Sequence, residues 1–104
     1  MQLGERIKEL RESQGLLQRQ LAASLEIDTP MFSKIERGDR KAKREQVLKL
    51  AQLLNTNEEE LLTIWLADQV YELVKDEDVA SSALRVAEEN FNYGKNKDGN
   101  PSIL

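Results

Sequence analysis

Apolar residues recur three or four positions apart along most of the chain, and short polar stretches divide this pattern into six segments. Such spacing places the apolar side chains on one face of an α-helix. No segment shows a competing strand signal. The pattern therefore predicts an all-α fold. The expected helices cover about residues 3–14, 18–25, 29–37, 47–54, 58–75 and 79–91.

The chain of 104 residues is long enough for one compact domain with short additions. It contains no cysteine and no histidine, so disulfides, thiolate metal ligands and the commonest general base are all excluded. The sequence shows neither a phosphate-binding glycine loop nor a nucleophile paired with a base. We therefore expect no enzyme activity, no catalytic residues, no cofactor and no metal.

The first ten residues are charged and do not form an export segment, and no run approaches the roughly 18 apolar residues of a membrane span. A cytoplasmic protein without a membrane partner is the expectation. Charge is divided unevenly along the chain. Residues 1–56 hold 11 Lys and Arg against 8 Asp and Glu, whereas residues 57–104 hold 4 against 11. This asymmetry indicates that the N-terminal half faces a polyanion, despite the net charge of −4.

The segment TPMFSKIERG, residues 29–38, has the start and stop signals of a short helix. Asp28 or Thr29 can cap it, and Pro30 is expected at its first helical position, where the missing N–H has no cost. Gly38 follows as the expected end. Only two of its apolar residues point inward, so most of the helix surface is left for something outside the core.

A turn of about four residues joins this helix to the one before it, which is a helix-turn-helix layout. The stretch LQRQLAASLEIDTPMFSKIERGDR resembles the lambda-repressor/Cro type, also called the xenobiotic-response-element family of regulators, and the likeness extends over residues 3 to about 66. The resemblance implies a lambda-repressor-like, five-helix DNA-binding domain with an additional C-terminal helix. The expected parts are a DNA-binding domain (1–66), a C-terminal helical extension (67–92) and a flexible tail (93–104).

The resemblance also assigns DNA contacts by position. Base contacts in the major groove are implied for Thr29, Pro30, Ser33 and Lys34, with Lys34 as the candidate for guanine. Phosphate contacts are implied for the residues around this helix. These are Gln18, Arg19, Arg37, Arg40, Lys41, Lys43 and Arg44.

Two positions depart from the family pattern. Glu26 stands in the turn where the family has a small residue, often glycine, and a left-handed conformation there costs a residue with a side chain about 1–2 kcal/mol. Either the turn differs from that of the family or it tolerates this strain. Pro30 replaces a polar residue that commonly contacts bases, so one direct contact is expected to be missing.

The segment 58–75 has two apolar rows, more than one neighbouring helix would cover. A homodimer seam is the preferred interpretation, and no small-molecule ligand is predicted. The residues assigned to dimerisation are Trp65, Leu66, Val70, Leu73, Val74 and Leu84.

These features predict a regulator that binds double-stranded operator DNA as a dimer and represses transcription, including that of its own gene. A controller of a restriction-modification operon, a phage repressor and an antitoxin-like regulator all share this pattern. A protein-interaction module with the same fold is the alternative from another class, since the acidic C-terminal helices could bind a partner. Strong, salt-dependent DNA binding would separate the two classes.

Overall fold

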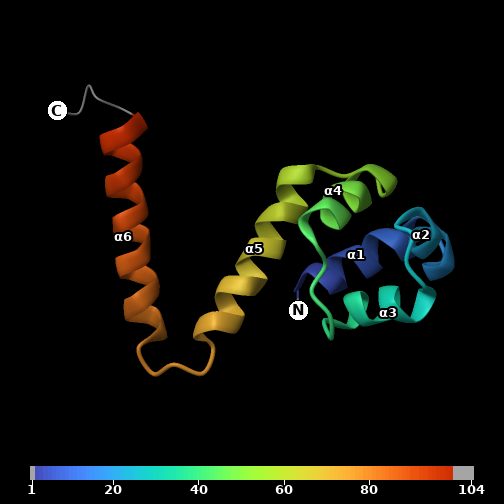
Figure 1. Ribbon diagram of the computed structural model, residues 1–104, viewed down its shortest axis with the longest axis horizontal. Helices are drawn as coiled ribbons and strands as arrows, with labels where there is room; N and C mark the ends of the chain where they lie inside the picture. The colour runs from blue at the N-terminus through green and yellow to red at the C-terminus, as the bar shows by residue number, and fades with distance from the viewer. Residues whose placement is uncertain (1, 100–104) are drawn as a thin grey trace. The chain divides into compact units, whose positions relative to one another are not determined.

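The structure is a computed structural model that describes residues 2–99, with side chains as far as Gly94. The described residues form helices and turns and no strand, which confirms the all-α prediction (Figure 1). The helices are α1 (Gln2–Ser13), α2 (Gln18–Ser24), α3 (Thr29–Arg37), α4 (Arg44–Leu53), α5 (Glu58–Val74) and α6 (Ala80–Gly99). None of them is long and apolar enough, within these residues, to cross a membrane.

The chain divides into two compact units, Met1–Tyr71 and Glu72–Leu104. The first unit continues five residues beyond the expected domain end at residue 66, because α5 stays attached to it through polar contacts described below. Helix α6 does not stop where the tail was expected to begin at residue 93, but continues to Gly99. Extending an existing helix fixes one residue for each hydrogen bond gained, which permits even a polar sequence to continue it. The rest of the expected tail, 100–104, lies outside the described residues.

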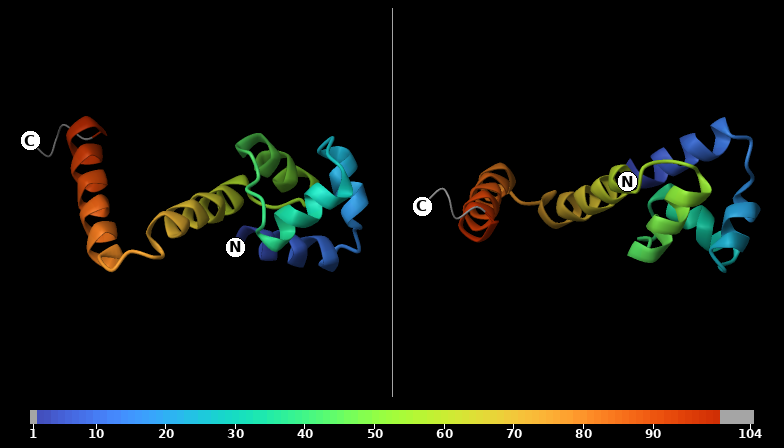
Figure 2. Two further views of the ribbon diagram at one scale, coloured as in Figure 1. Left: turned by 60° about the horizontal axis from the view of Figure 1, so that its bottom comes forward. Right: turned by 90° about the horizontal axis from the view of Figure 1, so that it is seen from above.

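In the first unit, helices α1 to α4 and the N-terminal half of α5 lie together in one cluster (Figure 1 and Figure 2). The two apolar residues of α3 that were expected to point inward, Phe32 and Ile35, are buried. Phe32, Ile7 and Val47 are fully buried, and Leu10, Leu16 and Leu25 pack against the same core. The complete buried set is Leu3, Ile7, Leu21, Ala22, Phe32, Ile35, Ala42, Val47, Leu50, Ala51, Leu54 and Leu61.

Helices α1 and α3 approach each other closely at Gly4. A Cβ atom on this residue would lie 2.2 Å from the backbone oxygen of Glu36, a distance that no side chain can tolerate. Glycine is therefore required at this crossing because it lets the two backbones come together.

An acidic residue of α5 caps the start of α1. The two carboxylate oxygens of Asp68 accept hydrogen bonds from the backbone N–H groups of Gln2 (3.1 Å) and Leu3 (2.9 Å). A carboxylate at a helix N-terminus satisfies free donors and interacts favourably with the helix dipole. The indole N–H of Trp65 donates to the carbonyl of Ala42 at 2.7 Å. These contacts connect α5 to the other helices of the first unit, and the contacts of Asp68 extend this connection beyond residue 66.

The turn between α2 and α3 has a left-handed residue at the position that the family resemblance indicated, so the turn does not differ from that of the family there. Glu26 has φ 59°, in the region that glycine adopts most easily. Gly15 (φ 69°) ends α1 in the same conformation, and Gly38 (φ 81°) ends α3 in it, at the position where this helix was expected to end. Glu26 therefore carries local backbone strain that the two glycines avoid.

We expect Glu26→Gly to stabilise the protein modestly. Relief of about 1–2 kcal/mol of left-handed strain is partly offset by about 0.5–1 kcal/mol of additional chain entropy in the unfolded state. Urea unfolding should show a higher midpoint for Glu26→Gly. Glu26→Ala is the control, because it keeps the Cβ atom and hence the strain. A midpoint that falls for the glycine variant would contradict this explanation.

Candidate nucleic-acid interface

Helix α3 is fixed at both ends by local sequence. The side chain of Asp28 accepts a hydrogen bond from the backbone N–H of Met31 at 2.8 Å, so Asp28 and not Thr29 is the capping residue. Thr29 occupies the first helical position and Pro30 the second, one later than expected. At the other end, the backbone N–H groups of Gly38 and Asp39 bond to the last turn of the helix. The helix thus has nine residues with defined ends.

One narrow face of α3 is buried and the rest of it is open. Phe32, Ile35 and Glu36 are buried. Of the residues expected to contact bases, Thr29, Pro30 and Lys34 are exposed, and Ser33 is half-buried. The hydroxyl of Ser33 accepts a hydrogen bond from Arg37 at 2.8 Å, and Arg37 also donates to Asp39 at 3.1 Å. The structure therefore brings the four base-contact candidates together on one short helix.

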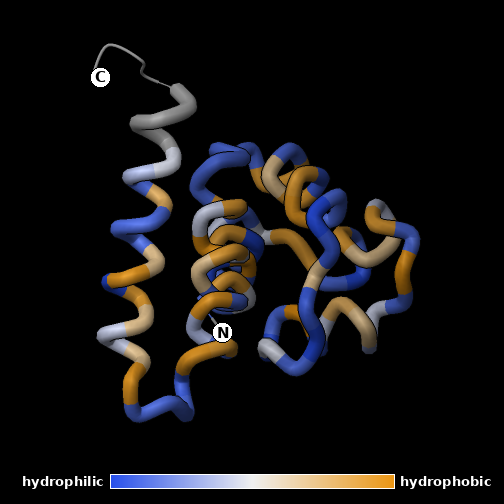
Figure 3. Tube along the Cα trace, turned by 60° about the vertical axis from the view of Figure 1, so that its left-hand side comes forward, coloured by the Kyte–Doolittle hydropathy of each residue, from blue (hydrophilic) through white to orange (hydrophobic). Residues whose placement is uncertain are grey.

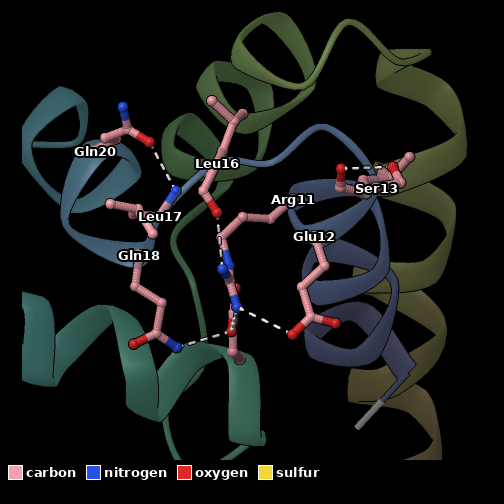
Figure 4. Close-up of polar contacts among 9 residues, drawn as sticks. Arg11, Glu12, Ser13, Leu16, Leu17, Gln18 and Gln20 are labelled. Carbon is pink, nitrogen blue, oxygen red and sulfur yellow. Dashed lines mark hydrogen bonds and ion pairs between the residues drawn. The ribbon is translucent and has the colours of Figure 1, made fainter.

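A buried ion pair connects α3 to α1. The guanidinium of Arg11 donates to both carboxylate oxygens of Glu36, at 2.6 and 3.2 Å, and to the carbonyl of Leu16 at 2.9 Å (Figure 4). The hydrogen bond to Glu36 raises the pKa of Arg11 above its ordinary value, although burial opposes this. The side chain of Glu36 is only 3% exposed, so the pair is almost completely removed from water.

Gln18, expected to contact phosphate, belongs to the same network. Its amide nitrogen donates to Glu36 at 2.9 Å (Figure 4). An amide nitrogen carries two hydrogens, so the second remains for another acceptor. Gln18 is half-buried at the first position of α2, where it connects the N-terminus of that helix to α3.

The N-termini of α2 and α4 have the same construction. The residues that precede the helices, Leu17 and Lys43, have no side-chain acceptor for the first helical N–H groups. Instead, Gln20 and Gln46 fold back and accept the backbone N–H of Leu17 (2.7 Å) and Lys43 (2.8 Å). The first turns therefore keep amide groups available for an outside acceptor.

The basic residues expected at phosphates are exposed, and some make contacts within the protein. Arg19, Arg37, Arg40, Lys41, Lys43 and Arg44 are all exposed. The guanidinium of Arg44 lies over the ring of Trp65, 5.4 Å from its centre, and the ammonium of Lys41 donates to Gln69 at 3.4 Å.

The residues assigned to a dimer seam fall in both units. Leu66 (54% exposed) and Val70 lie in the first unit, whereas Leu73 (78%) and Leu84 lie in the second and are also exposed. Val74 is half-buried. Trp65, also half-buried, is engaged by the contacts already described with Ala42 and Arg44. The structure places it at the attachment of α5 to the first unit.

Residues 2–63 match the family model described as a helix-turn-helix domain, which is more than half of the chain. The chain belongs to the helix-turn-helix domain family. A helix-turn-helix domain of this kind supports the assignment of the chain as a DNA-binding regulator. The matched residues include α1 to α4 and the start of α5. The searches matched no curated protein and no solved structure.

Glu36 is a structural residue of α3 that pairs with Arg11, 25 positions earlier in the chain. A signal for this pairing was present, because Arg11 follows Ile7 by four positions and Glu36 follows Phe32 by four. Opposite charges on the inward faces of two helices therefore indicate a buried pair.

We expect the loss of one partner of this pair to be costly and the loss of both to be tolerated better. Arg11→Met or Glu36→Leu should each lower the free energy of unfolding by about 3–5 kcal/mol, because each leaves a buried charge without its partner. The double variant should recover a large part of this loss. Urea unfolding of all four proteins measures the coupling, and losses that simply add would contradict it.

Proposed function

We propose that this protein is a sequence-specific transcriptional regulator that inserts α3 into the major groove of operator DNA. The open face of α3 is the observation that carries this proposal. The helix keeps Thr29, Pro30 and Lys34 exposed while its opposite face is held by Phe32, Ile35 and the Arg11–Glu36 pair. A helix that is fixed by its buried face and presents its other face to solvent can insert into the major groove and contact base edges.

Different residues of α3 read different base features. Lys34 donates to the O6 and N7 acceptors of guanine, and the apolar parts of Thr29 and Pro30 pack on a thymine methyl group. Ser33 donates or accepts through its hydroxyl when Arg37 turns from it to a phosphate. These roles rest on the resemblance in sequence and on the exposure of Thr29, Pro30 and Lys34.

The flanking groups hold the phosphate backbone. The open N-termini of α2 and α4 offer backbone N–H groups and partial positive charge to phosphates. Gln18 and Arg19 act at the first helix, and Lys43 and Arg44 at the second. Arg37, Arg40 and Lys41 add charge between them, which contributes affinity and salt dependence more than sequence choice.

We further propose that two copies bind together and repress transcription, including that of the protein's own gene. Two recognition helices about one turn of DNA apart read a site with two-fold symmetry. A bound dimer blocks access of polymerase to the promoter. The seam assigned to Leu66, Val70, Leu73, Val74 and Leu84 supplies contacts between the copies, and the position of Trp65 suits it to supporting α5.

The test begins with selection of duplexes from a random pool, followed by fluorescence-anisotropy titration of the best site and of a scrambled duplex. We expect a symmetric site and a steep loss of affinity with salt. Lys34→Ala should weaken binding to the selected site about 10-fold or more, since a good base contact contributes about 1–3 kcal/mol. Arg40→Ala should instead lower the salt slope by about one unit on every duplex.

Lys49→Ala is the matched control, because it removes an exposed lysine of α4 to which no DNA contact is assigned. Its affinity for the selected site should not change. Equal and weak binding to all duplexes, with no sequence enriched, would contradict operator binding. That result would favour a protein-interaction module.

A further inference from the structure

Helix α6 has an apolar face that its own unit does not cover. Every described side chain from Ser81 to Tyr93 is exposed, including Leu84 and Phe91 (67% exposed). Figure 3 shows hydrophobic segments recurring along the helix between polar ones. Water contact along a whole row of apolar side chains is unfavourable, so this face requires a partner.

The row follows the spacing of a coiled-coil seam. Ala80, Leu84, Ala87, Phe91 and Gly94 are separated alternately by four and three positions. This 4-3 repeat keeps one narrow stripe facing a single neighbouring helix. The side chains in the stripe alternate between small and large. The expected partner therefore presents small residues where α6 presents large ones.

A second copy of α6 meets this requirement only in the antiparallel direction. Leu84 then lies opposite Ala87 of the second copy, and Phe91 opposite Ala80 of the second copy. Each large side chain fills the space beside a small one. A parallel pair would place large against large and alanine against alanine, which leaves voids at the alanine layers.

Charge favours the same direction. The segment before α6 contains three consecutive acidic residues, Asp76, Glu77 and Asp78, whereas the sequence of its last turns contains Lys95, Lys97 and Asp98, two positive charges against one negative. Antiparallel pairing brings the acidic end of each helix to the basic end of the other, and it also opposes the two helix dipoles. Parallel pairing would place like charges together.

We propose that α6 pairs with α6 of a second copy as an antiparallel two-helix seam centred between Leu84 and Ala87. Of the seam proposed above, the inference concerns only the part in α6, which contains Leu84, and it gives that part a direction and a register. Only its effect on DNA binding rests on the proposed function. The seam covers about 20 Å of helix, less surface than the roughly 800 Å² per partner of a standard stable interface. Self-association is therefore modest in solution and is strengthened when DNA holds two copies together.

Engineered cysteines test the register directly, because the natural chain has none. In the full chain, Ala80→Cys combined with Phe91→Cys should give a disulfide-linked dimer in oxidised glutathione buffer. The two positions are 11 residues apart on one helix, about 16 Å, too far for a bridge within a copy. Either cysteine alone should give little dimer in the antiparallel pair.

Ser82→Cys combined with Glu89→Cys is the matched control. The midpoint of positions 82 and 89 along α6 is the same as that of positions 80 and 91. The two control positions lie on the side of the helix opposite the stripe, so they should not cross-link. Circular dichroism of each variant checks that helix content is unchanged. Leu84→Asp, added to the Ala80→Cys and Phe91→Cys variant, should abolish the cross-link, because it places a charge in the seam.

The outcomes separate this inference from the proposed function. The assay contains no DNA, so a protein that failed to bind any operator could still cross-link through α6. Cross-linking of the 80/91 pair alone supports the seam. Efficient cross-linking by Ala80→Cys alone would indicate a parallel pair, equal cross-linking of the control would indicate random collision, and absence of any cross-link would show no pairing. Each of these three results would overturn the inference.

Discussion

The ion pair between Arg11 and Glu36 is the interaction on which the arrangement of the first unit depends. One carboxylate receives donors from α1 and α2, while the guanidinium also donates to the loop between them at Leu16. Removing two charges from water offsets most of their attraction, so the pair adds little net stability over an apolar equivalent. Its value lies in geometry. A bidentate pair with further fixed partners permits few orientations of α3 relative to α1 and α2.

This constraint explains how so small a helix can have an open surface. A helix of nine residues gains little from its own hydrogen bonds and depends on packing. Phe32 and Ile35 supply apolar burial on one narrow face, and Glu36 adds a polar anchor beside them. Asp28 and Gly38 define the ends without using the outer residues. The side chains of Thr29 and Lys34 are therefore not needed for the stability of the fold. The residue types at these two positions can be selected for binding alone.

The sequence could predict what depends on local periodicity and local capping. The number of helices in the described residues, most of their bounds and the inward residues of α3 follow from spacing and from residue type, whereas the C-terminal end of α6 does not. The family resemblance, and not the spacing, drew attention to the turn at Glu26. Contacts between distant residues were beyond it wherever no pattern of inward-facing charges indicated them. Asp68 caps a helix 65 positions away, and Gly4 is required by a backbone oxygen of α3. Nothing near either residue in the chain specifies its partner, because only the folded arrangement brings the two together.

The shortness of the α6 stripe has a consequence for regulation. In the dimer that we propose, a seam between two α6 helices would contribute only part of the free energy that holds two copies on one site, and DNA would contribute the rest. Binding of the first copy would then raise the effective concentration of the second, and the coupling would act in both directions, so DNA would also promote pairing. Occupancy of the operator would rise with more than the first power of protein concentration. For a protein that represses its own gene, such steepness holds its concentration close to the value at which pairing begins.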